Sequence, residues 1–172
     1  RRNSCTGVAS GTLRYQCHPR RYRWCCKDRD VFHPMSNSSI KLEQEAMRLL
    51  LDGDDDTLAL LREQMQHVVT IRREYTGSGS YAHFNLDSNC PCLPGNASFA
   101  FGDVVCEVDG VDGGGGFVLF VNDGLLDFLE TYSFDSFWPE EIDGYTVQYQ
   151  EVGGRRDLEA LRRSRGWSGQ GE

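Results

Sequence analysis

A run of five apolar residues near the middle of the chain constrains the fold more than any other feature of the sequence. It covers residues 117–121, Phe-Val-Leu-Phe-Val, and lies between four glycines and the turn sequence Asn-Asp-Gly at 122–124. A short continuous apolar run between turn signals is typical of a strand that is covered on both faces. Asp-Gly favours a tight hairpin, so residues 125–132 should form a second strand beside residues 117–121. We therefore predict that this strand pair forms the centre of the fold and that Phe120 is buried.

The segment from Ser38 to residue 68 predicts two helices. Ser38 or Ser39 can cap a first helix, in which apolar residues recur at helical spacing as far as Gly53. A second apolar stripe follows the three aspartates at 54–56, whose charge suits a positive helix N-terminus. Because the connection between the two helices is short, we expect them to pack as a helical hairpin.

The aspartates of this connection also come close to the spacing of a calcium-binding loop. Asp52, Asp54 and Asp56 follow at steps of two, and Glu63 lies eleven residues after Asp52. These are ligand positions of an EF-hand loop, but the sharp turn of that loop needs glycine at its sixth position, which is Thr57 here. We therefore expect an acidic helix cap without tight calcium binding.

Beyond residue 68 the apolar period falls to two, which is typical of strands. The alternation covers residues 69–75, 81–86, 104–108 and 145–149, and a glycine-rich turn at 77–79 joins the first two as a hairpin. Together with the central pair this gives about six strands, mostly antiparallel. Helices followed by strands place the chain in the α+β class, with an N-terminal helical hairpin followed by the sheet.

Charge divides the chain near residue 34. Residues 1–34 hold eight Lys or Arg residues against two acids, whereas residues 35–172 hold ten against 24. We predict a single domain over 35–152, preceded by a disordered or non-native extension over 1–34 and followed by a short helix and frayed tail over 153–172. A nucleic-acid-binding arm and a zinc knot are the alternatives for the extension, although its cysteines form no C-x2-C pair. The acidic region itself repels nucleic-acid phosphates.

The cysteines predict the compartment and one weak metal candidate. An odd total of seven argues against a disulfide framework, and no apolar run approaches the ~20 residues of a membrane helix. We therefore expect a reducing cytoplasm, no membrane and no cofactor. Cys90 and Cys92 form a C-x-C pair that could be half of a zinc site or a redox pair, but no second pair follows it.

Acids and aromatic residues are interleaved over residues 125–143. Simple alternation along a strand puts Glu130 on the same face as Leu126 and puts Asp127 on the opposite face. An acid desolvated among aromatic side chains has a raised pKa and can serve as a general acid. The alternative is an edge strand with protective charges, followed by a loop whose aromatics fill the core. The candidate catalytic residues are Glu130, Asp127 and Glu140, and the candidate binding residues are Tyr132, Phe137 and Trp138.

Several of these segments resemble one group of proteins. The stretch FVLFVNDGLLDFLE at 117–130, the following Thr-Tyr and the Trp-Pro pair at 138–139 are similar to a set of short uncharacterised bacterial proteins. The similarity extends to residues 73–77 and to the helix over 49–65, and covers roughly residues 38–150. The resemblance implies one domain, and no activity is assigned to that set.

No motif in the sequence fixes a reaction, so the function is predicted from charge. The 24 acids of residues 35–172 would speed association with a basic protein. We expect a non-catalytic acidic binding or inhibitory domain, similar in role to bacterial immunity proteins, with a basic protein or a second copy of the chain as partner. The competing hypothesis is a small hydrolase-like enzyme that uses Glu130 and neighbouring acids. A buried acid in a concave pocket would favour the enzyme, and a flat acidic or aromatic face would favour binding.

Overall fold

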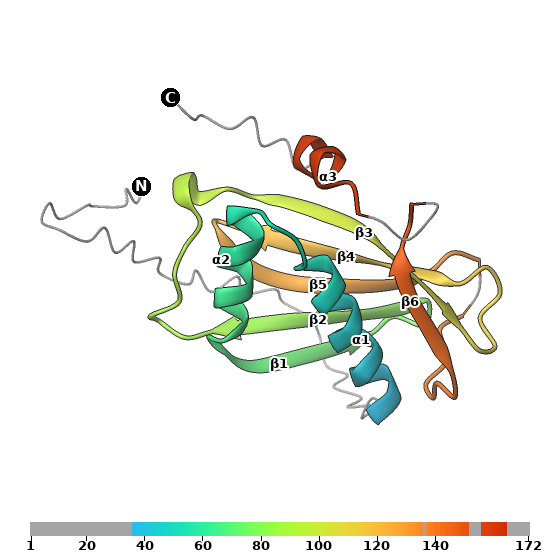
Figure 1. The fold of residues 1–172 in the computed structure, drawn as a ribbon. Helices are drawn as coiled ribbons and strands as arrows, with labels where there is room; N and C mark the ends of the chain where they lie inside the picture. Colours follow the sequence, from blue (N-terminus) through green and yellow to red (C-terminus); the bar gives the residue numbers. More distant parts are fainter. Residues whose placement is uncertain (1–35, 136, 152–155, 165–172) are drawn as a thin grey trace, which may run out of the picture.

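The computed structural model describes residues 36–135, 137–151 and 156–164, which form a two-layer α+β structure (Figure 1). Its antiparallel sheet has six strands in the order β1-β2-β5-β4-β3-β6. The predicted α+β class and mostly antiparallel sheet are therefore confirmed. The elements are α1 (Asn37–Leu50), α2 (Asp56–Met65), β1 (Val68–Tyr75), β2 (Gly79–Leu86), the 3-10 turn η1 (Pro94–Asn96), β3 (Phe99–Val108), β4 (Gly115–Asn122), β5 (Leu125–Ser133), β6 (Tyr145–Tyr149) and α3 (Leu158–Ser164).

Side-chain caps start both long helices. Ser36 accepts a hydrogen bond from the Ser39 amide at 3.2 Å, so α1 begins slightly earlier than the sequence predicts. Asp55 accepts one from the Leu58 amide at 3.1 Å, which makes the acidic connection a helix cap, as expected. The principal contacts of α1 are with β3 and β6, and those of α2 are with β5. The hairpin packing of one helix on the other stays a prediction.

The strand pair β4–β5 occupies the centre of the sheet, as the sequence predicts. Asp123 and Gly124 have φ angles of 50° and 80°, the left-handed values that a two-residue hairpin turn requires. Phe117 faces the helices and is 1% exposed. Phe120 points to the opposite face and is only half-buried, so the prediction that it is buried is wrong. The reason is visible in Figure 1, where α1 and α2 cover the same face of the sheet.

A bulge in β5 changes which residues share a face. Phe120 lies opposite Phe128, but Val121 lies opposite Leu126, so Asp127 is an extra residue in the ladder. Leu126 is consequently buried with Val121 on the helix-facing side, with exposed fractions of 2% and 3%. Simple alternation, which puts Leu126 on the face of Glu130, is therefore wrong at this point.

The short helix α3 falls within the C-terminal segment for which a helix is predicted. The segment before it is tied to the domain by Arg156, whose guanidinium donates to both Asp103 carboxylate oxygens, at 2.6 and 2.9 Å. The same guanidinium donates to the Leu50 carbonyl at 2.8 Å, at the end of α1. The predicted extension over 1–34 lies outside the described residues. Within the described ranges, no helix is both long and apolar enough to cross a bilayer.

Candidate functional site

One face of the sheet brings together three of the site residues that the sequence predicts, Glu130, Asp127 and Tyr132. Neighbouring strands bring together side chains that point away from α1 and α2, and we call this surface the open sheet face. Tyr81 lies opposite Glu130, and His83 lies opposite Phe128. Phe128 in turn lies opposite Phe120. All of these side chains are half-buried. The open sheet face consists of Arg72, Glu74, Tyr81, His83, Val118, Phe120, Asp127, Phe128, Glu130 and Tyr132.

Glu130 lies between two tyrosines on this face. The Tyr81 hydroxyl donates to Glu130 Oε1 at 3.3 Å. The negative charge of Glu130 is the largest cause that raises the pKa of Tyr81. Burial raises the pKa of Tyr132, and the Glu130 charge adds to that effect. Both tyrosines therefore remain protonated donors near neutral pH, next to an acceptor carboxylate.

Asp127 reaches the same face because of the bulge. Burial lowers the pKa of His83, as does the charge of Arg72, whereas the charge of Asp127 raises it. Asp127 is therefore near enough to act on the imidazole from the open sheet face. The structure thus brings Asp127 and Glu130 to one side of the sheet, although simple alternation separates them.

Phe128 is the centre of an aromatic cluster on the open sheet face. Its ring stacks on Phe120, with 4.2 Å between centroids and 16° between planes. The Tyr81 ring meets it edge-on at 5.6 Å, and the His83 ring lies 5.3 Å away. The cluster gives the face an apolar centre with charged groups around it.

The remaining candidates of the 125–143 segment do not join this cluster. Trp138 is 3% exposed, its amide donates to the Gly77 carbonyl at 2.9 Å, and its ring lies against Gly115 at the start of β4, so it fills the core there. Phe137 is 85% exposed. Glu140 is exposed in the loop before β6, and its charge helps burial to raise the pKa of Tyr75. Of these two loop aromatics, Trp138 fills the core, as the alternative interpretation predicts, and Phe137 does not.

Cys90 and Cys92 are buried, each with an exposed fraction of 6%. The Cys92 thiol contacts the Asp123 carbonyl oxygen at 3.2 Å. Within the described residues, no group of three His, Cys, Asp or Glu side chains is arranged to hold a metal ion. The environment of both thiols is that of core residues next to a hairpin turn.

Sequence reasoning missed a cavity on the other side of the sheet, between α1, α2 and strands β1, β2 and β5. This helix–sheet cavity has a volume of about 290 Å³. It is lined by Glu43, Gln44, Met47, Arg48, Leu51, Arg62, Met65, Ile71, Arg73, Ala82, Phe84 and Leu129. A second cavity, of about 210 Å³, lies between β3 and the segment around α3. Glu130 and Asp127 line neither of the two.

A buried ion pair forms the polar part of the helix–sheet cavity. Arg73 donates from Nε to Glu43 Oε2 at 2.8 Å, and the Glu43 side chain is only 6% exposed. Burial raises the pKa of Glu43, against the opposing effect of the Arg73 charge and hydrogen bond. Glu43 Oε1 has no hydrogen-bond partner. A local sequence signal could have revealed this buried acid, because Glu43 lies on the buried stripe of α1 between Ser39 and Met47.

The described structure thus offers two surfaces of different character, one open and acidic with an aromatic centre, the other a partly enclosed apolar cavity. No family model, curated protein or solved structure matches this chain. The resemblance to short bacterial proteins therefore stays a prediction, and these two surfaces are the candidate functional sites of the described residues.

Proposed function

We propose that this chain is a non-catalytic binding or inhibitory domain of the cytoplasm, comparable in role to small acidic immunity proteins, and that it recognises a basic protein. The observation that carries the proposal is the open sheet face, where Glu130 and Asp127 flank the stacked rings of Phe120 and Phe128. Aromatic side chains dominate the energetic centres of protein interfaces, and charges at the rim set the rate and the choice of partner.

The arrangement suits a partner that presents Lys or Arg side chains. A guanidinium over the Phe128 ring would gain a cation–π interaction while its N–H groups reach Glu130. The Tyr81 hydroxyl, already bonded to Glu130 at 3.3 Å, helps to hold the carboxylate in place. A preorganised acceptor loses less conformational entropy on binding, so it supports tighter association.

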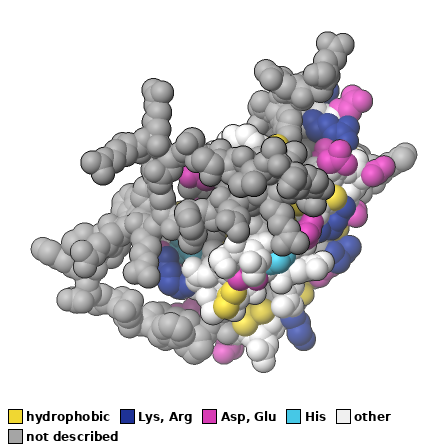
Figure 2. All heavy atoms as spheres, turned by 90° about the vertical axis from the view of Figure 1, so that its left-hand side faces the viewer, with side chains coloured by type: hydrophobic (Ala, Val, Ile, Leu, Met, Phe, Trp, Pro, Cys, Tyr) yellow, Lys and Arg dark blue, Asp and Glu magenta, His cyan; other side chains and the backbone are white. Residues whose placement is uncertain are grey.

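The charge of the whole domain supports the same class of partner. Residues 35–172 hold 24 acids against ten Lys or Arg residues. On the part of the surface seen in Figure 2, acidic side chains lie beside Lys and Arg side chains, with small hydrophobic areas between them. Long-range attraction would therefore come from the net charge, and the docking position from the open sheet face.

Affinity capture from a bacterial host lysate tests this proposal with two matched double variants. Glu130→Gln with Asp127→Asn neutralises the open sheet face without changing side-chain size. Glu45→Gln with Glu63→Gln makes the same charge change on α1 and α2. Surface plasmon resonance then measures association of the captured partner at low and high salt.

We expect a basic partner whose association rate falls at least ~10-fold between about 0.05 and 0.5 M salt. The open-face double variant should weaken binding about tenfold, and the helix-face control should stay within about twofold. A partner that binds both variants equally would contradict the assignment of the open sheet face. A self-associating chain, detected by analytical ultracentrifugation and disrupted by the same variant, would make a second copy the partner.

A small hydrolase-like enzyme using Glu130, Asp127 and Glu140 is the second candidate. In its favour, Glu130 is hydrogen-bonded to Tyr81, and Asp127 acts on His83 on the same face. Against it, Glu130 and Asp127 line neither cavity, and Glu140 lies near Tyr75 instead of joining them. Turnover of chromogenic esters, glycosides or phosphates that is lost in Glu130→Gln would favour the enzyme over the binding domain.

A further inference from the structure

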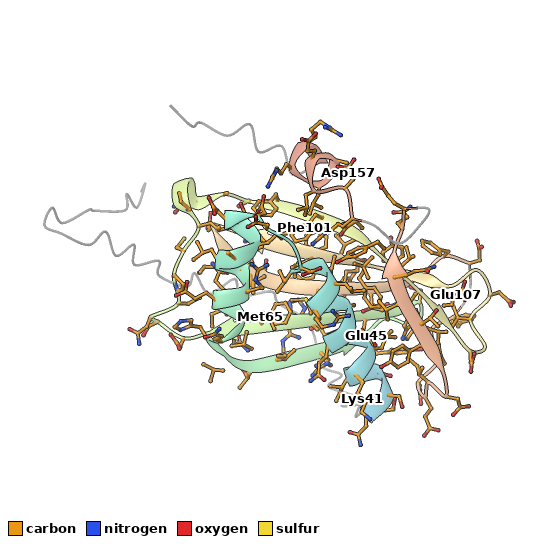
Figure 3. All side chains as sticks on the ribbon, viewed as in Figure 1. Lys41, Glu45, Met65, Phe101, Glu107 and Asp157 are labelled. Atoms are coloured by element: carbon orange, nitrogen blue, oxygen red, sulfur yellow. The ribbon has the colours of Figure 1, made fainter. Side chains whose placement is uncertain are left out.

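The helix–sheet cavity is distinct from the open sheet face, because the sheet itself separates them. Its walls are mostly apolar and come from both layers. Met47 and Leu51 belong to α1, Met65 belongs to α2, and Ile71, Ala82 and Phe84 belong to β1 and β2. Figure 3 shows Met65 near the end of α2, above strands β1 and β2. Methionine side chains adapt to ligands of varied shape, which suits a binding cavity.

The size of the cavity sets the size of a ligand. Its 290 Å³ lies at the lower end of the range for small-molecule sites. At the ~30 Å³ that one water occupies in the liquid, the space would hold about ten non-hydrogen atoms. A short alkyl chain with one polar group, such as octanoate, has this size.

The polar groups of the cavity are incompletely satisfied. Glu43 is 4% exposed, and its Oε1 atom has no hydrogen-bond partner. Arg73 uses Nε for the ion pair, and no hydrogen bond from its terminal N–H groups is present within the described residues. Glu43 Oε1 is an acceptor and needs a donor such as water, whereas the terminal N–H groups of Arg73 are donors from which the carboxylate of a ligand can accept.

The sign of the charge at the cavity distinguishes between an acid and an amine as ligand. Arg48, Arg62 and Arg73 line it against one acid, Glu43, although acids outnumber bases 24 to ten over residues 35–172. Arg62 donates to the Gly53 carbonyl at 3.2 Å and to that of Leu51, which it caps. Arg48 is exposed and makes no hydrogen bond or ion pair within the described ranges. The cavity therefore has an uncompensated positive charge at its mouth.

We propose that the helix–sheet cavity binds a small amphipathic carboxylic acid, a medium-chain alkanoate in its simplest form. The carboxylate lies near Arg48 and the terminal N–H groups of Arg73, where charge-assisted hydrogen bonds are strong. The alkyl chain lies against Met47, Met65 and Phe84 and removes their apolar surface from water. This site is independent of a basic partner on the open sheet face, so either proposal can fail without the other.

Isothermal titration calorimetry of the full chain with octanoate tests the proposal, and octan-1-ol and octylammonium serve as neutral and cationic analogues of equal length. We expect saturable one-to-one binding of octanoate with a dissociation constant on the order of 0.1 mM. Each analogue should bind about tenfold more weakly, because it lacks the charge that the arginines recognise.

Two variants place the binding in the cavity. Arg48→Glu should weaken octanoate binding about tenfold. Because the Arg48 side chain is exposed and makes no hydrogen bond or ion pair within the described residues, we expect this variant to fold, and circular dichroism checks it. Lys41→Glu is the matched control, since Lys41 lies on the same helix outside the cavity (Figure 3) and should change the affinity by less than about twofold. Ala82→Leu fills the base of the cavity and should abolish binding, with circular dichroism as the check on folding.

Three results would overturn the proposal. The first is no saturable heat with octanoate at millimolar concentration. The second is tighter binding of octylammonium than of octanoate, which would make Glu43 the recognition group and the ligand a cation. The third is octanoate binding that Arg48→Glu leaves unchanged, which would place the ligand elsewhere on the molecule.

Discussion

Replacement of Gln64 should lower the free energy of unfolding strongly, even where the side-chain volume is kept. Its side chain is completely buried in α2, and it bridges three segments that are distant in sequence. The amide nitrogen donates to the carbonyls of Pro91 and Gly124 at 2.7 and 2.8 Å. The amide oxygen accepts from the Leu126 N–H at 2.8 Å. Gln64 thereby fastens α2 to the β4–β5 turn and to the loop before β3.

Gln64→Leu keeps the volume and removes all three hydrogen bonds. The Leu126 N–H would stay buried without its partner, at a cost of about 1–3 kcal/mol, and each of the other two bonds contributes about 1 kcal/mol. The Gly124 carbonyl keeps a second bond, from the Leu93 amide at 2.9 Å, which limits the loss there. The free energy of unfolding should therefore fall by about 3–5 kcal/mol, a large part of the ~5–15 kcal/mol of a typical domain.

Urea unfolding followed by circular dichroism measures this loss. With a slope of about 2 kcal/mol per molar urea, the midpoint should move down by about 2 M. Gln66→Leu is the control, because Gln66 is exposed at the end of the same helix and its replacement should cost less than about 0.5 kcal/mol. If Gln64→Leu loses less than about 1 kcal/mol at an unchanged slope, the bridge is not a stabilising feature and the reasoning fails.

Two further predictions concern the central strand and the buried acid. Phe117→Ala should lower the free energy of unfolding by about 3–5 kcal/mol, because Phe117 is 1% exposed. Phe120→Ala should lower it by less than half of that, because Phe120 is only half-buried. Equal losses in urea unfolding would contradict this difference between the two faces. Burial raises the pKa of Glu43 above its ordinary value of 4.5, so the folded state binds the proton more tightly than the unfolded chain. The Glu43 contribution to the free energy of unfolding should therefore fall as the pH rises from 4.5 through the raised pKa. Unfolding of the parent chain and Glu43→Gln between about pH 4 and 8 measures this, and a constant difference between the two would refute it.

The backbone plan could be predicted because its signals are local. Periods of 3.6 and two separate the helices α1 and α2 from the strands that follow, and Asp123-Gly124 supplies the positive φ angles of a tight turn. Asp55 caps α2, as the acidic residues before that helix predict. These features depend on neighbours within a few residues, so the sequence carries them in readable form.

The candidate site could be predicted only in part. The sequence points to the acids and aromatics of β5, and the structure collects Glu130, Asp127 and Phe128 on one surface. The sequence does not show the bulge at Asp127, because an extra residue in a strand changes the pairing with β4 and leaves the local apolar pattern intact. The sequence left Trp138 either as a binding residue or as a loop aromatic that fills the core, and the structure packs it into the core at 3% exposure.

The sequence by itself determined the elements, their order and the antiparallel class, because steric and hydrogen-bonding preferences act between near neighbours. Only the tertiary structure decided which face of the sheet the helices cover, and hence that Phe117 is buried while Phe120 stays on the open sheet face. Only tertiary packing joined Glu43 to Arg73, 30 residues away, and Gln64 to Gly124, 60 residues away. The energy of such contacts depends on which surfaces meet after folding, and no local pattern of residues records that choice.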